Sequence, residues 1–169
     1  MLFRSVPHFV TRENECEQIM KYLHPANACR CVFLHGVPGI GKTALAVKVA
    51  NDILKTNDRT VVVYVNCKYV DSFDDFAGKV VQQSYHGYYP QNDPIPAMKK
   101  RLQSYDFLTI LLLDNFEFLS HFNDPDETKK VEEFVAEVVT SSGNVKLLVT
   151  SSVNVGAFPE IGRDRKSTV

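Results

Sequence analysis

The sequence lacks the patterns that mark membrane, secreted and metal-binding proteins. Its four cysteines include no paired Cys-x-x-Cys spacing, and its five histidines are scattered without metal-ligand spacing. Residues 1–10 lack the long apolar core of a signal peptide, and no hydrophobic run approaches the length of a membrane span. We therefore expect reduced thiols, no structural zinc and a cytoplasmic location.

Neither sign of charge predominates. The formal net charge is -1 at pH 7, which gives no electrostatic reason to expect nucleic acid or a membrane as the main partner. The 169 residues suit one domain with a hydrophobic core, and no internal repeat or low-complexity segment divides them. We therefore expect a globular domain with no nucleic acid and no membrane among its partners.

One glycine-rich stretch carries most of the functional information. Residues 36–43 have the sequence GVPGIGKT and fit the phosphate-binding pattern G-x-x-x-x-G-K-[ST]. A short apolar run at 31–35 precedes them, and good helix formers follow at 44–55. Backbone N–H groups and a helix N-terminus would then face the phosphates. A glycine-rich turn that merely connects two elements is the alternative, and these flanks disfavour it.

The residue types in this loop suit a nucleotide bound with Mg²⁺. Glycines let the backbone curl with its N–H groups inward, a lysine can reach the β- and γ-phosphates, and a threonine hydroxyl can ligate Mg²⁺. The predicted nucleotide-binding residues of the loop and the start of the helix are Val37, Pro38, Gly39, Ile40, Gly41, Lys42, Thr43 and Ala44.

Strand and helix patterns alternate along the chain. Ligands of parallel sheets bind beyond the carboxyl ends of the strands, where the glycine loop, Asp114 and Ser151 all fall. The alternation predicts an α/β fold in three layers, with a parallel sheet flanked by helices. We expect strands at 31–35, 60–66, 107–114 and 145–150, the second buried on both faces, and helices at 12–23, 44–55, 73–81, 97–104 and 127–140.

Two helix starts carry capping signals. Thr11 is the expected N-cap of the first helix, and Ser72 with Asp75 has the spacing of a capping box. These residues would satisfy backbone N–H groups that the first turn leaves without intrahelical acceptors.

A second nucleotide element lies at 110–114, where four apolar residues are followed by Asp114. This is the form of a Walker B strand, which fixes the carboxylate where it can hold Mg²⁺ beside Thr43, directly or through water. A strand that happens to end in an aspartate is the alternative. Its place downstream of a complete glycine loop favours the metal-binding interpretation.

In these features the sequence resembles the nucleotide-binding module of the STAND ATPases, especially the NB-ARC type of apoptotic activators, plant resistance proteins and NLR receptors. The resemblance covers residues 9–152 and rests, in order, on the segments FVTRE, GVPGIGKTA, LLLDNFE and LLVTSS. It implies a P-loop NTPase sheet of the ASCE type with strand order 2-3-4-1. The family's further strand beside the first one is not evident, so we expect the last strand to be lacking.

The resemblance also implies ligands and partners. The FVTR position runs along the adenine in that family, so Val10 would contact the base through its backbone and Arg12 would bind near the nucleotide. A solvated surface arginine is the alternative for Arg12. The implied cofactors are ATP or ADP with Mg²⁺, with Thr43 and Asp114 as metal ligands. The implied partners are proteins that bind through further domains, with nucleotide-dependent homo-oligomerisation of a full-length parent that acts in signalling and innate immunity.

The same comparison suggests a division of the chain. Residues 1–30 would form an N-terminal helix and adenine-contacting segment, 31–152 the P-loop nucleotide-binding core, and 153–169 an irregular tail. The family's later helical and winged-helix regions have no recognisable counterpart here. We therefore expect a chain truncated after the sensor strand.

Two positions depart from the family pattern. Asn115 follows Asp114 where an acidic residue often activates water, and an amide cannot accept a proton at neutral pH. The sensor segment 150–152 ends without arginine, although Ser151 could still hydrogen-bond near the γ-phosphate. Glu117 could replace the missing base. The catalytic candidates are therefore Lys42, Asp114 and Glu117.

Three functions follow from these features. Because both departures weaken hydrolysis more than binding, we expect first an ATP- or ADP-binding switch with slow hydrolysis. An active ATPase of the AAA or ORC-like kind, with Glu117 polarising the attacking water, is the alternative. A third possibility is a non-enzymatic interaction domain whose nucleotide site has decayed.

Overall fold

Strands and helices alternate along the chain, as the sequence predicts. The computed structural model describes residues 12–84, 93–103, 107–141, 144–153 and 167–168. Within these ranges, no helix has the length and apolar character that crossing a membrane requires. The elements are α1 (Glu13–Leu23), β1 (Cys31–His35), α2 (Lys42–Thr56), β2 (Thr60–Asn66), η1 (Cys67–Tyr69), α3 (Phe73–Ser84), α4 (Pro94–Leu102), β3 (Leu108–Asp114), η2 (Phe116–His121), α5 (Pro125–Thr140), β4 (Val145–Ser151) and β5 (Ser167–Thr168).

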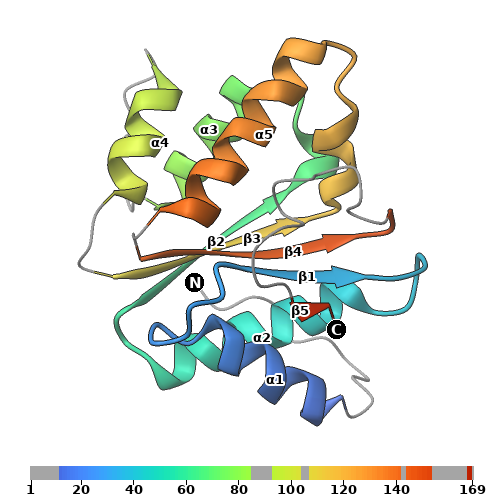
Figure 1. Ribbon diagram of the computed structural model, residues 1–169, viewed down its shortest axis with the longest axis vertical. Helices are drawn as coiled ribbons and strands as arrows, with labels where there is room; N and C mark the ends of the chain where they lie inside the picture. Colours follow the sequence, from blue (N-terminus) through green and yellow to red (C-terminus); the bar gives the residue numbers. More distant parts are fainter. Residues whose placement is uncertain (1–11, 85–92, 104–106, 142–143, 154–166, 169) are drawn as a thin grey trace.

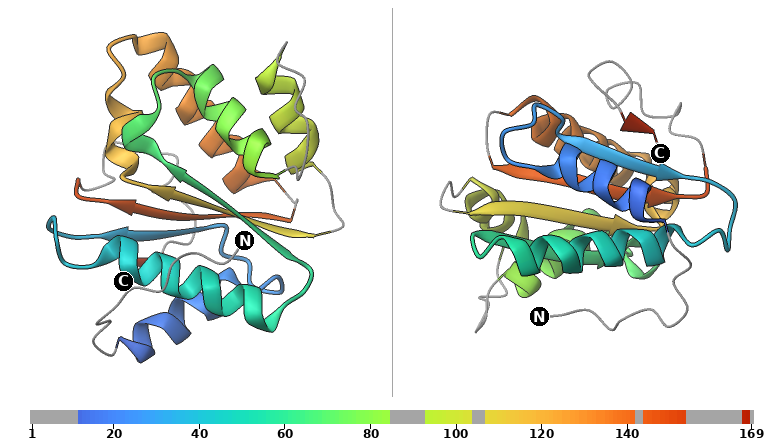
Figure 2. Two further views of the ribbon diagram at one scale, coloured as in Figure 1. Left: turned by 180° about the vertical axis from the view of Figure 1, so that it is seen from behind. Right: turned by 90° about the horizontal axis from the view of Figure 1, so that it is seen from below.

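The strands form one parallel sheet in the order β2-β3-β4-β1-β5 (Figure 1). The position of β4 between β1 and β3 brings the carboxyl ends of these three strands together at one edge. Helices α1 and α2 cover one face of the sheet, and α3, α4 and α5 cover the other (Figure 2). The predicted three-layer fold and the order 2-3-4-1 are confirmed.

Both edge strands differ from the expectation. We expected the strand beside β1 to be lacking, but β5 pairs in parallel with Val32 and Phe33. Its two residues are polar and too few to show hydrophobic periodicity. Strand β2 was expected to be buried on both faces, yet Val61, Val62 and Tyr64 are only partly buried. An edge position explains this, because β2 pairs with β3 alone among the described residues.

The helix starts agree with the sequence in part. Helix α3 begins after Ser72, whose hydroxyl accepts a hydrogen bond from the N–H of Asp75 at 3.1 Å, as predicted. The Asp75 carboxylate accepts from the N–H of Asp71 at 3.2 Å rather than closing the capping box. Helix α1 begins one residue later than expected, after Arg12, which makes no side-chain cap. Thr11, the expected N-cap, lies outside the described residues.

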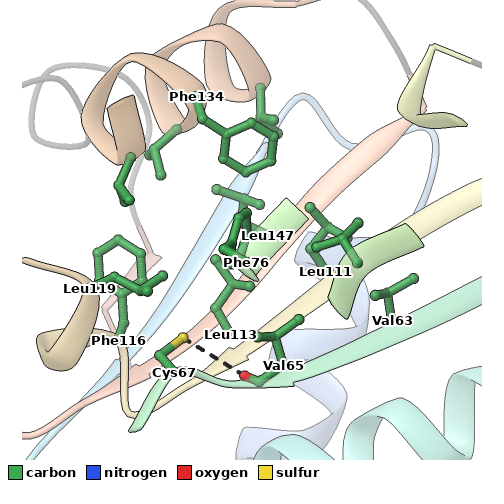
Figure 3. Close-up of a cluster of buried hydrophobic side chains, with 14 of the residues drawn as sticks. Val63, Val65, Cys67, Phe76, Leu111, Leu113, Phe116, Leu119, Phe134 and Leu147 are labelled. Carbon is green, nitrogen blue, oxygen red and sulfur yellow. Dashed lines mark hydrogen bonds between the residues drawn. The ribbon is translucent and has the colours of Figure 1, made fainter. Parts of the chain in front are cut away.

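A separate hydrophobic core fills each face of the sheet. Under α3 and α5 the core is aromatic: Phe76 stacks on Phe73 with ring centroids 5.8 Å apart and meets Phe134 edge-on at 5.4 Å. Figure 3 shows Phe134 above Phe76, Leu111 and Leu147. The opposite core, beneath α1 and α2, is aliphatic; its most buried members include Ile19, Leu23, Leu45, Val49, Ile110, Leu112 and Leu148.

We predict that Phe76→Ala lowers the free energy of unfolding by about 3–5 kcal/mol, because it opens a cavity under two helices. Urea denaturation followed by circular dichroism measures this change. The matched control is Phe118→Ala, whose side chain is 45% exposed and whose loss should change stability by no more than about 0.5 kcal/mol. Equal losses in the two variants would contradict this account of the core.

Candidate functional site

The loop between β1 and α2 presents backbone donors at a helix start. Gly39 and Gly41 have φ angles of 82° and 93°, a left-handed conformation that strains other residue types. The first helical bond runs from the N–H of Leu45 to the carbonyl of Gly41 at 2.9 Å. The N–H groups of residues 42–44 therefore precede the helical ladder and lie at the positive end of the helix dipole. Such a terminus binds anions.

Lys42 folds back over the same loop. Its ammonium donates to the carbonyl oxygens of Gly36 at 2.7 Å and Val37 at 3.1 Å. The outer side of the loop is open, since Val37 and Ile40 are 66% and 54% exposed and Pro38 is also exposed. A positive charge and a helix N-terminus at an open loop suit a phosphate chain.

Asp114, at the end of β3, is a buried carboxylate with a donor from each of four segments. Its Oδ1 accepts from the hydroxyls of Thr43 at 2.7 Å and Thr150 at 2.5 Å. Its Oδ2 accepts from the Tyr64 hydroxyl at 3.0 Å and the Asn115 side-chain amide at 3.2 Å. These bonds offset the cost of taking the carboxylate out of water. The structure thus brings Thr43 and Asp114 into contact; their role as metal ligands stays a prediction.

The donor set at this contact fits Mg²⁺. A hydroxyl and a carboxylate are the hard oxygen ligands that this ion prefers, and Thr43 is exposed beside the buried Asp114. Within the described residues, no group of three or more His, Cys, Asp or Glu side chains could hold a metal ion. An ion at Thr43 and Asp114 would therefore need phosphate oxygens and water to complete its ligand shell.

Three polar residues around Asp114 escaped the sequence analysis. Tyr64 and Thr150 bond it directly, and Asn66, its register partner on β2, accepts from the Asn115 amide at 3.1 Å. Burial, followed by the nearby Asp114 carboxylate, raises the pKa of Tyr64, so its hydroxyl remains a donor at neutral pH. A polar residue at the carboxyl end of each parallel strand is the signal that could have identified Asn66 and Thr150.

Asn115 occupies the position where an acidic neighbour was expected. Its φ of 57° is left-handed, a conformation that asparagine tolerates better than most residues. Its N–H donates to the Thr150 hydroxyl at 3.1 Å and its side chain donates to Asn66 and Asp114. The residue therefore acts as a hydrogen-bond donor at the site, and its amide provides no base.

Glu117 is linked to the segment that follows β4. Its Oε1 accepts from the Ser152 hydroxyl at 2.6 Å. Burial alone would raise the pKa of Glu117, but hydrogen bonds from Ser152 and its neighbours outweigh burial and lower the pKa. The group is therefore a carboxylate at neutral pH, as a general base must be. Ser151, in register with His35 just before the loop, exchanges hydrogen bonds of 3.1 Å with the backbone of Val153.

The predicted base-contacting residues are placed only in part. Val10 lies outside the described residues. Arg12 immediately precedes α1 and bonds through its guanidinium to Glu15, an interaction that raises the pKa of Arg12 and lowers that of Glu15. Residues 12–15 line a surface hollow. The contact of Val10 and Arg12 with a nucleotide stays a prediction.

The fold and this edge of the sheet together define a P-loop NTPase domain: the strand order, the glycine loop and the buried carboxylate beside Thr43 are its parts. The family described as AAA ATPase domain matches residues 8–140. The chain belongs to that family. No curated protein sequence matches the chain at a significant level.

Solved structures show the same fold. The chain is similar to the Aeropyrum pernix ORC2 protein solved as ADPNP–ADP complexes (TM-score 0.67, 22% identity, 96% of this chain and 48% of that one). It is similar to Drosophila ORC bound to DNA, with a TM-score of 0.69 and 22% identity over 93% of this chain and 41% of that one. It is also similar to Cdc6p from Pyrobaculum aerophilum, with a TM-score of 0.63 and 16% identity over 99% of this chain and 46% of that one. The chain thus spans about half the length of these proteins or less. The findings show the P-loop NTPase fold that was predicted. They do not show membership of the NB-ARC type specifically.

We predict that Tyr64→Phe lowers the free energy of unfolding by roughly 1–3 kcal/mol, because it removes a hydrogen bond to a charged, buried acceptor and keeps the ring. Chemical denaturation at pH 7 measures the loss. Tyr69→Phe is the matched control, since this tyrosine is 65% exposed and should lose no measurable stability. The same small effect in both variants would show that the Tyr64 hydroxyl contributes nothing to holding Asp114.

Proposed function

We propose that this domain binds ATP or ADP with Mg²⁺ and works as an ATPase domain of the AAA, ORC-like kind. The hydrogen bond of 2.7 Å between Thr43 and Asp114 carries the proposal, because it joins the glycine loop to the end of β3. Membership of the AAA ATPase domain family supports it, as does the likeness to an ORC2 protein solved with ADPNP and ADP.

Each part of the site has a distinct role in this proposal. The N–H groups of residues 42–44, with those of Gly39 and Gly41, would cradle the phosphates, and the Lys42 ammonium would move from the loop carbonyls to the β- and γ-phosphates. Thr43 and Asp114 would hold Mg²⁺, which neutralises phosphate charge when it is bound. Ser151, near the start of the loop, would bond close to the γ-phosphate. Val10 and Arg12 would contact the nucleoside.

Hydrolysis requires a base, and Glu117 is the candidate. Its carboxylate is ionised, but one oxygen accepts from Ser152. A water would have to lie within hydrogen-bond reach of that carboxylate for the reaction to proceed. An active ATPase therefore depends on Glu117 together with Lys42 and Asp114.

A slow nucleotide switch of the NB-ARC, NLR-like type is the second candidate. One observation favours it: the residue after Asp114 is an asparagine that donates hydrogen bonds where a base would accept a proton. In this version the bound nucleotide changes the state of a longer signalling protein and turnover is secondary. Protein partners and nucleotide-dependent homo-oligomers would then depend on other parts of that protein.

Direct DNA binding is not part of the proposal. Drosophila ORC was solved bound to DNA, but this chain has a formal net charge of -1, which provides no excess of positive charge to neutralise phosphates.

We predict that ATP and ADP raise the melting temperature, and that Mg²⁺ increases the shift. A ligand at a hundred times its Kd adds about 2.7 kcal/mol of stability. Lys42→Ala should lose most of this response in a thermal-shift titration with ATP, ADP and GTP. Lys48→Ala is the control, because Lys48 lies six residues further along the same helix and pairs with Asp52. No shift by millimolar ATP or ADP would instead indicate a decayed site and a non-enzymatic interaction domain.

We predict that Glu117→Gln abolishes ATP turnover while its Kd for ATP stays within about twofold, since the amide keeps the shape and removes the base. Phosphate release and a binding titration measure the two quantities. Glu133→Gln, on the exposed side of α5, should change neither. Unchanged turnover in Glu117→Gln would exclude this base and favour the slow switch.

A further inference from the structure

Lys146 is a fully buried charge at the end of the sheet opposite the glycine loop. It is the second residue of β4 and has 0% exposure. Its ammonium donates to four backbone carbonyl oxygens: those of Tyr22 at 3.1 Å, His24 at 2.8 Å, Asn27 at 2.8 Å and Cys29 at 2.9 Å. Buried lysines are rare unless they are paired, and here carbonyl dipoles take the place of a counter-ion.

The charge state of Lys146 agrees with this shell of acceptors. Burial lowers the pKa of Lys146 to about 8, which still leaves the amine mainly protonated at pH 7. An ammonium has three N–H donors, whereas a neutral amine has two, so the carbonyl oxygens favour the charged form. Among the described residues, no carboxylate pairs with it. Its ionisable neighbours are Cys29, whose thiol pKa is raised by burial, and Arg30.

Three of the four carbonyls belong to the connector between α1 and β1, and the fourth, that of Tyr22, belongs to the last turn of α1. This connector, residues 24–30, is folded on itself: the Asn27 side chain donates to the carbonyl of Lys21 at 3.1 Å and accepts from the N–H of Cys29 at 2.9 Å. Lys146 therefore ties the last turn of α1 and the start of β1 to β4. The bond from the N–H of Leu147 to the carbonyl of Arg30, at 2.8 Å, adds a backbone link at the same place.

Helix α1 extends from this anchor towards the nucleotide edge. Its last turn lies at the side where β1 and β4 begin, and it runs beside α2 on the same face of the sheet (Figures 1 and 2). Eleven residues of helix rise about 16 Å, and the five steps from Lys146 to Ser151 span about 17 Å of strand. Arg12, at the start of α1, is thus one helix length away from Lys146.

Hydrophobic packing also holds α1 against α2 and β1. Its buried residues Cys16, Ile19 and Leu23 pack on an aliphatic core, and such contacts are non-directional. The hydrogen bonds to Lys146 are directional and act at one point. Losing them would let α1 shift along α2 and would move Arg12 and the hollow that residues 12–15 line.

We propose that Lys146 is a positioning residue that sets where α1 presents Arg12, and that it thereby tunes affinity for the nucleoside part of the ligand and leaves the phosphate part unaffected. This inference rests on the proposed function. The glycine loop lies between β1 and α2, Thr43 on α2 and Asp114 at the end of β3, and the hydrogen bonds of Lys42 and Thr43 there involve no residue of the connector.

The test compares Lys146→Met with the parent by calorimetric titration of Mg²⁺ complexes of ATP and of inorganic tripolyphosphate. We expect about a tenfold weaker Kd for ATP and less than about a twofold change for tripolyphosphate, because the latter has no nucleoside. Lys146→Arg retains a charged donor and should recover part of the ATP affinity. If Lys146→Met does not fold, Lys146→Arg is compared with the parent in the same way. The expected change in the ratio of the Kd for ATP to the Kd for tripolyphosphate is then smaller.

Leu147→Ala is the matched control for lost stability. Leu147 is the next residue of β4, is equally buried, and faces the opposite core, so its truncation should leave the ratio of the two Kd values unchanged. An unchanged ratio in Lys146→Met, or equal weakening of both ligands, would overturn the positioning role alone. Failure of the parent chain to bind either ligand would overturn the proposed function and this inference with it.

Discussion

The buried carboxylate of Asp114 is the constraint on which the site depends. A carboxyl group with 2% exposure requires hydrogen-bond partners, and here the donors come from α2, β2, β4 and the residue after β3. No two of these donors are neighbours in sequence. The carboxylate can therefore be satisfied only when the parallel sheet has formed with β4 next to β3, so the site is complete only in the folded order of strands.

A second buried charge of opposite sign lies at the other end of the same face. Lys146 is surrounded by backbone carbonyls of the end of α1 and the connector that follows it, whereas Asp114 accepts from side-chain groups of several elements. The difference has a physical consequence. Side-chain donors can be exchanged for a metal ion without moving the backbone, so Asp114 suits a site that changes its ligands. Carbonyl acceptors can be released only if the chain moves, so Lys146 suits a fixed anchor.

The sequence predicted those parts of the molecule that are encoded locally. The glycine loop with its flanks, the apolar run ending in Asp114 and the helix faces are continuous patterns, and each was recognised. Tyr64, Asn66 and Lys146 act through contacts between strands and connectors far apart in the chain, which depend on sheet order and register. Strand β5 is too short for a pattern. The segment FVTRE led to a finer family assignment than the fold supports, because P-loop domains share the same loop and strand.

In the proposed function, binding and hydrolysis draw on separate parts of this edge. The groups proposed to bind phosphate and metal are Lys42, Thr43 and Asp114, held by the loop, α2 and β3. The candidate base belongs to η2 and is held by Ser152, beyond the end of β4. The hydrogen bond between Glu117 and Ser152 can therefore change without disturbing the bonds of Thr43 to Asp114. A chain built this way can retain nucleotide affinity while its turnover is adjusted or lost, which is the property that a nucleotide-dependent switch requires.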